Sequence, residues 1–220
     1  MDLRPPAAAR AARRLAAAAV LGAAWLAFAR EASATFPRLV SARALDPGAA
    51  EVRLAGTAAN TDPDHVAAWV AGRRGLFRSV ELGARLGAIR QDRAQDGSTG
   101  PLFGVDAKVQ VLRESIDIPL DVAVDVGWTV GVVSGETYSD LSVAGLFGWS
   151  VRALPVFGDV VVTVGAEMVF LDGSARPGAD ETAAYGLASV ELALGRHLAF
   201  TPEVKVGTHV VYGAALRYRF

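Results

Sequence analysis

Polar and apolar side chains alternate without interruption over residues 210–220, and this stretch constrains the fold more than any other. One set of alternate positions is apolar and holds Val210, Tyr212, Ala214, Leu216, Tyr218 and Phe220. The other set holds Val211, Gly213, Ala215, Arg217 and Arg219. Because successive side chains of a β-strand point to opposite faces, the pattern predicts a strand with one apolar face and one polar face.

The same period of two recurs through most of the chain and predicts about ten strands. They cover residues 50–58, 65–74, 80–88, 103–111, 116–130, 141–151, 160–170, 184–194, 198–206 and 210–220. Hydrophobic residues make up 52% of the sequence, yet no stretch after residue 34 is a continuous apolar run long enough for a transmembrane helix. This combination predicts an all-β fold, a closed antiparallel transmembrane β-barrel of about ten strands. Eight strands is the alternative, because the first two stretches are poorly patterned.

The first part of the chain has the features of a cleavable signal peptide. A positively charged start carries Arg4, Arg10, Arg13 and Arg14. An apolar run over 15–29 follows, and Ala32 and Ala34 give the small-x-small form of a cleavage site. We therefore expect a signal peptide at 1–34 and one barrel domain at 35–220, which begins with an extended lead over 35–47. An N-terminal membrane anchor is the alternative, but the run is shorter than the ~20 residues that a spanning helix needs.

The C-terminal stretch, together with the signal peptide, resembles small bacterial outer-membrane β-barrel proteins of Gram-negative cells. The residues that carry the resemblance, read as an assembly signal, are Tyr212, Gly213, Leu216, Tyr218 and Phe220. The resemblance implies transit with periplasmic chaperones, insertion by the barrel-assembly machinery and localisation in the outer membrane. It also implies contact with lipid and lipopolysaccharide, and a porin-like monomer. It implies no reaction, so we expect a protein that is not an enzyme.

Loop lengths and aromatic residues give this barrel an expected orientation. Connections at 60–64, 91–102, 134–140 and 172–181 are long and alternate with short turns, as in barrels with short periplasmic turns and longer external loops. Aromatic side chains on the apolar face gather near strand ends, which predicts two girdles at the membrane interfaces. The outer girdle would contain Phe103, Trp128 and Phe170, and the inner one Trp149, Phe200, Tyr218 and Phe220.

The polar face of the predicted strands carries both signs of charge. We expect a charge network in the lumen made of Glu81, Arg85, Asp106, Lys108, Asp121, Asp125, Glu167, Glu191, Glu203, Lys205 and Arg217. Paired charges would fill a narrow interior, because an unpaired buried charge is costly. Asp121, Asp125 and the acids of neighbouring strands are expected to pair across the interior with Arg85, Lys108, Lys205 or Arg217. The alternative is an open channel whose selectivity depends on the same side chains.

The residues favour no chemistry beyond this. A net charge of −1 argues against a nucleic-acid partner, and no cofactor or metal motif is present. Asp121 and Asp125 would stand roughly 13 Å apart along a strand, too far for a carboxylate pair. The expected function is therefore an integral outer-membrane protein without a catalytic site, structural or a narrow channel with a charged lumen. The alternatives are a hydrolase at the outer rim, where His65 and His209 would lie, and a soluble periplasmic ligand-binding barrel.

Overall fold

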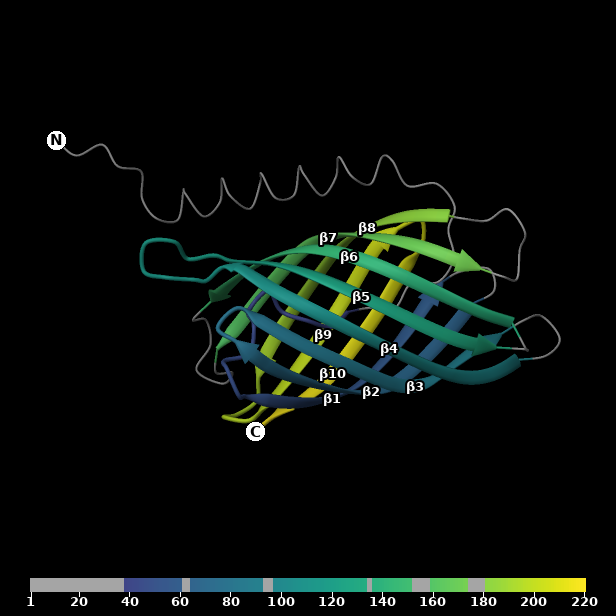
Figure 1. The fold of residues 1–220 in the computed structure, drawn as a ribbon, viewed down its shortest axis with the longest axis horizontal. Helices are drawn as coiled ribbons and strands as arrows, with labels where there is room; N and C mark the ends of the chain where they lie inside the picture. Colours follow the sequence, from purple (N-terminus) through teal and green to yellow (C-terminus); the bar gives the residue numbers. More distant parts are fainter. Residues whose placement is uncertain (1–37, 61–63, 93–96, 134–135, 152–158, 174–180) are drawn as a thin grey trace.

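A computed structural model describes residues 38–60, 64–92, 97–133, 136–151, 159–173 and 181–220. The predicted signal peptide at 1–34 lies outside the described residues. Ten strands form the fold (Figure 1): β1 Ala50–Asn60, β2 Asp64–Phe77, β3 Val80–Asp92, β4 Gly97–Leu112, β5 Asp121–Val133, β6 Glu136–Val151, β7 Val160–Gly173, β8 Glu181–Ala193, β9 Leu198–Gly207 and β10 Val210–Arg219.

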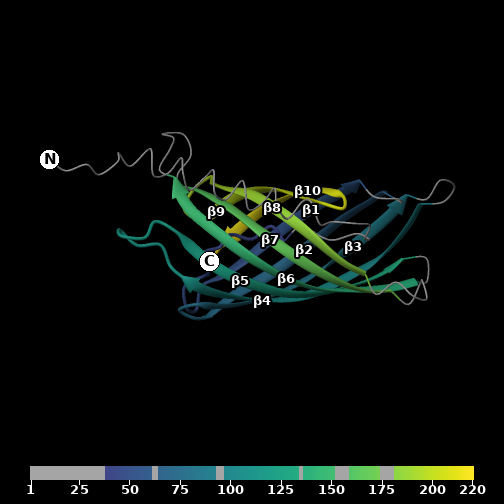
Figure 2. The ribbon, with the colours of Figure 1, turned by 90° about the horizontal axis from the view of Figure 1, so that it is seen from above.

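Each strand pairs antiparallel with its neighbour in sequence, and β1 pairs with β10 to close the barrel. Glu51 stands opposite Arg219 in this closing pair, and the Phe220 N–H donates to the Ala50 carbonyl at 2.9 Å. Closure leaves no unpaired strand edge. Figures 1 and 2 show the strongly tilted strands wrapping around a common axis. The predicted closed antiparallel barrel of ten strands is confirmed, and the alternative of eight strands is wrong.

Two details of the strand prediction are wrong. β5 begins at Asp121 and not at residue 116, because Pro119 lacks the N–H that a ladder needs. The chain before it folds on itself instead, with the Ser115 N–H donating to the Ile118 carbonyl at 2.9 Å. The expected alternation of loop lengths is also absent, since β4 and β6 extend through most of the predicted loops at 91–102 and 134–140. The predicted turn at 154–158 lies outside the described residues.

The largest departure from expectation is the stretch before β1, which was predicted to be an extended lead. Residues 38–49, here called the plug segment, turn back into the barrel. All of its residues from Arg38 to Leu45 except Arg43 are buried. The plug segment belongs to no strand and forms no ladder with the wall. The lumen is therefore filled partly by backbone and not by wall side chains alone.

A tight turn at the mouth of the barrel directs the plug segment inward. Gly48 has φ +82°, a conformation that glycine adopts without strain, and the Ala49 N–H donates to the Asp46 carbonyl at 3.0 Å. Gly48 and Ala49 then bond to the backbone of Gly75 in β2 at 2.9 and 3.0 Å. A Cβ on Gly75 would lie 2.3 Å from the Asp46 carbonyl oxygen, so only glycine permits this approach. At the same mouth Arg113 donates to Asp46 at 2.7 Å, and this hydrogen bond lowers the pKa of the Asp46 carboxyl.

The charged interior as the candidate functional site

The buried charged side chains of the barrel wall point into the lumen. In β5, Asp121, Ala123 and Asp125 are at most 1% exposed, while Val124 and Val126 are about 40% exposed on the outer face. All eleven residues of the predicted network face the interior. Nine of them are buried, and Asp106 and Glu191 are half-buried, with 13% and 12% of their side chains exposed.

The strand residues that face the lumen carry more acid than base. Across the described strands the acids are Glu51, Glu81, Asp106, Asp121, Asp125, Asp140, Glu167, Glu191 and Glu203. The cationic side chains are Arg53, Arg73, Arg85, Lys108, Lys205, Arg217 and the half-buried Arg219, which pairs with Glu51. The wall is therefore two negative charges in excess when all of these groups are ionised. The plug segment offsets this excess with Arg38 and Arg43.

Arg38 lies at the centre of the interior, and its guanidinium contacts three strands. Its Nε donates to Glu167 Oε1 of β7 at 2.7 Å, and its Nη2 donates to Ser142 Oγ of β6 at 2.6 Å. Its Nη1 lies 2.8 Å from Asp125 Oδ1 of β5. The side chain is only 3% exposed, and those of Asp125 and Glu167 are 1% and 2% exposed. Charge-assisted contacts of this kind are about twice as strong as neutral ones.

The backbone beside Arg38 is fixed by Glu203 of β9. One carboxylate oxygen accepts from the Arg38 N–H at 2.9 Å and the other accepts from the Leu39 N–H at 2.8 Å. Leu39 has φ 53°, which costs a non-glycine residue of order 1–3 kcal/mol. Its carbonyl accepts from Arg53, and its side chain packs in the apolar cluster that includes Trp69, Ile89, Leu102 and Val133. Packing and hydrogen bonds together hold the strained residue.

A second group of contacts holds the plug segment nearer the mouth. Arg43 Nε donates to Asp121 Oδ2 at 3.2 Å, and Arg43 Nη2 donates to Glu114 Oε2 at 2.6 Å. Lys108 Nζ donates to the carbonyls of Ser41 and Arg43 at 3.2 and 2.9 Å. The Leu45 N–H donates to Glu81 at 2.9 Å. Several polar backbone groups along this part of the segment therefore bond to wall side chains.

The remaining ion pairs lie within the wall, on one strand or between strands one or two places apart. Arg73 lies 2.8 Å from Glu81 and also pairs with Asp106, and Arg217 lies 2.7 Å from Glu191. The other pairs are Arg53 with Glu51, Lys108 with Glu81, and Lys205 with Glu167. Lys108, Lys205 and Arg217 thus pair with acids of other strands as expected, but Asp121 and Asp125 are not their partners. The closest cationic partners of Asp121 and Asp125 are Arg43 and Arg38 of the plug segment, and Arg73 lies further from Asp125, at 3.9 Å.

The predicted network omitted seven charged residues of this interior. Arg38 and Arg43 lie before the first strand, Asp140 was placed in a loop, and Arg219 lies at the end of the last strand. Glu51, Arg53 and Arg73 lie on the two poorly patterned strands. A signal for the two plug arginines was nevertheless present, because the predicted lumen set holds more acids than bases. Arg85 donates to Thr129 at 3.2 Å, and both border a narrow polar crevice with Arg38, Asp140 and Ser142.

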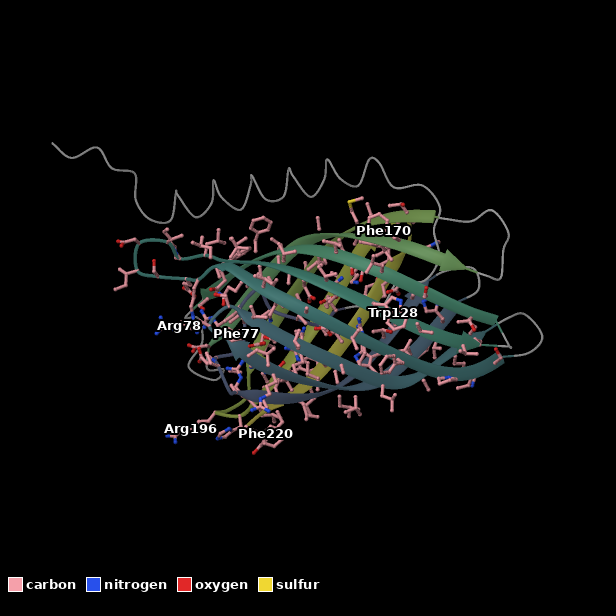
Figure 3. All side chains as sticks on the ribbon, viewed as in Figure 1. Phe77, Arg78, Trp128, Phe170, Arg196 and Phe220 are labelled. Carbon is pink, nitrogen blue, oxygen red and sulfur yellow. The ribbon has the colours of Figure 1, made fainter. Side chains whose placement is uncertain are left out.

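The predicted girdle and assembly residues lie on the outer face, except Gly213, which belongs to the inward-facing set of β10. Phe103, Trp128, Phe170, Phe200, Tyr212, Leu216, Tyr218 and Phe220 are exposed, and Trp149 and Gly213 are half-buried. Figure 3 shows Phe220 at the end of the barrel where β10 finishes, with Trp128 and Phe170 further toward the opposite end. Rings contact one another in both groups: Phe103 meets Trp128 edge-on at 6.4 Å between centroids, and Tyr218 meets Phe220 at 5.1 Å.

Other kinds of site find little support in the part of the chain that the structure describes. His65, expected at the outer rim, is buried and points inward. No group of three or more His, Cys, Asp or Glu side chains could hold a metal ion there. None of the described residues belongs to a helix long and apolar enough to cross a membrane.

The fold and the site together define a class of protein: a closed ten-stranded antiparallel β-barrel whose charged interior is occupied by its own plug segment. The sequence matches no protein-family model and no curated protein.

Proposed function

We propose that this protein is an integral outer-membrane β-barrel without catalytic activity, closed at rest by its plug segment. The observation that carries the proposal is that the barrel is apolar outside and polar inside, the reverse of a soluble protein. Leu54, Val70 and Leu86 are 60%, 51% and 68% exposed on the outer face, whereas Glu81, Lys108 and Asp121 are fully buried inside. An apolar outer band around a polar interior is typical of membrane barrels.

The soluble alternative fits this arrangement poorly. A soluble ligand-binding barrel keeps polar side chains in water and offers an apolar pocket for its ligand. Here the crevice beside Arg38 is polar and has no room for a water-sized molecule. The lengths of the strands also suit a membrane, since every strand has at least the 9–11 residues that a tilted spanning strand needs.

The plug segment favours a closed barrel over an open channel. It contacts the seven strands β1 to β7 and also β9 through the hydrogen bonds and ion pairs described above. Leu39 joins the apolar cluster deeper in the lumen, so the polar and the apolar parts of the interior are both filled. A steady ionic current would need this segment to leave.

Membrane fractionation combined with heat-dependent gel mobility tests the proposal. The protein should sediment with outer membranes, resist extraction by alkaline carbonate and migrate differently before and after boiling. Recovery of the folded protein in the soluble periplasmic fraction would refute the membrane assignment. Planar bilayers test the closed state, for which we expect little or no steady conductance.

A further inference from the structure

The barrel wall contains a complete recognition site for a guanidinium group. Asp125, Ser142 and Glu167 come from three adjacent strands and present one oxygen each to Nη1, Nη2 and Nε of Arg38, at 2.8, 2.6 and 2.7 Å. A planar guanidinium offers donors in a fixed fork, and oxygens placed around the fork distinguish it from a compact ammonium ion. The three side chains are almost completely excluded from water.

The group that occupies this site does not belong to the wall. Arg38 is part of the plug segment, which pairs with no strand and is held by side-chain contacts alone within the lumen. One residue further, Leu39 keeps a strained backbone that is released when the segment leaves. The wall is also two negative charges in excess before the plug arginines are counted. Without Arg38 the site would therefore need another cation.

We propose that Asp125, Ser142 and Glu167 form a guanidinium-binding site, in which Arg38 is the resident ligand and which takes a small alkylguanidinium cation when Arg38 is absent or withdrawn. The inference rests on the proposed function in one respect, because the closed barrel is the state in which Arg38 occupies the site and keeps other cations out of it. The site itself is a property of the folded barrel and can be tested in detergent.

Chemical rescue of Arg38→Ala provides the test. The purified variant is unfolded by heat in detergent with increasing methylguanidinium chloride at millimolar concentration, with methylammonium chloride as the control for charge and ionic strength. Above saturation the melting temperature should rise by roughly 3–5 °C for each tenfold increase in methylguanidinium. Methylammonium should give less than half of this shift. The unmodified protein should respond equally to both salts, because Arg38 already fills the site.

Two further variants test whether the rescue is specific to this site. Arg43→Ala removes a guanidinium from the same segment, but that side chain is 34% exposed and is bound near the mouth, so methylguanidinium should not rescue it selectively. Adding Asp125→Asn to Arg38→Ala should abolish the selective rescue. If Arg38→Ala does not stay folded, the yield of refolded barrel with each salt replaces the melting temperature, and methylguanidinium should raise it several-fold over methylammonium.

Equal effects of the two salts on Arg38→Ala, or selective rescue that persists with Asp125→Asn, would overturn the proposal. Neither result depends on where the protein resides in the cell. A failure of the guanidinium site and a failure of the membrane assignment are therefore distinguishable.

Discussion

A disulfide between the plug segment and the wall would fix the position of the plug directly. A Cβ built on Gly148 of β6 would lie 2.9 Å from the Cβ of Ala42, and Ala42 is completely buried. Disulfides join Cβ atoms about 3.8 Å apart, so the segment must shift by somewhat less than 1 Å to accommodate the bond. The chain has no cysteine of its own, so Ala42→Cys combined with Gly148→Cys can form only one intramolecular bond. We expect it to form on mild oxidation of the folded protein.

The expected effect on stability follows from the length of the loop that the bond closes. A loop of about 100 residues corresponds to about 4.7 kcal/mol of stabilisation in the chain-entropy account. For a chain of this size, each kcal/mol raises the melting temperature by roughly 2–4 °C, so the upper limit is roughly 9–19 °C. Because the unmodified separation is shorter than the ideal one, we expect a gain near the lower value. Reduction of the bond should abolish the gain.

The matched control moves the wall cysteine by one residue. Phe147 is 46% exposed on the outer face, so Ala42→Cys combined with Phe147→Cys places the two thiols on opposite sides of the wall. Thiol labelling and non-reducing electrophoresis measure the bond in both pairs. A pair at 42 and 148 that stays reduced, or that forms no faster than the control, would refute the docking of the plug segment inside the barrel.

Three other changes test which face of the wall is outside, how the plug segment is held and whether Phe220 acts as an assembly signal. Val124→Arg should cost roughly 2–4 kcal/mol in a folding titration in lipid, because it places a charge on the apolar face. A cost near zero would show that the faces are misassigned. Glu203→Gln should lower the free energy of unfolding by roughly 1–3 kcal/mol, because an amide has one oxygen for the two buried N–H groups of Arg38 and Leu39. An unchanged urea midpoint would show that Glu203 does not hold the plug segment. Deleting Phe220 should reduce the amount of assembled barrel in outer-membrane fractions, and undiminished assembly would count against its part in recognition.

Alternation made the wall predictable from the sequence. In β5, Asp121 and Asp125 face inward while Val122, Val124 and Val126 face outward, so both the strand and its facing follow from the pattern. The same pattern caused the error at its start, because Ile116, Ile118 and Leu120 continue the alternation beyond the point where Pro119 prevents strand pairing. Alternation is a property of side chains and does not reveal that a residue lacks a backbone N–H.

The plug segment was not predictable in the same way, because its conformation depends on residues far away in sequence. Arg38 and Glu203 are 165 residues apart, and no local pattern links them. The segment has neither a period of two nor a helical period, so its residues alone indicate only an extended chain. The acid excess on the predicted inner face was the available clue, since a closed interior requires cations from elsewhere to balance it.

The width of the barrel explains why a plug segment is needed at all. Eight strands enclose an interior that side chains can fill, and ten strands enclose a wider one. Part of the inward face of β5 and β6 consists of the small residues Ala123, Ala144 and Gly148, although Leu146 on the same face is large. These small residues leave a groove, in which Val40 and Ala42 of the plug segment pack with Ala123 and Ala144. The wall and the segment are thus complementary in volume as well as in charge. A substitution that enlarges the groove residues would compete with the plug segment for the same space.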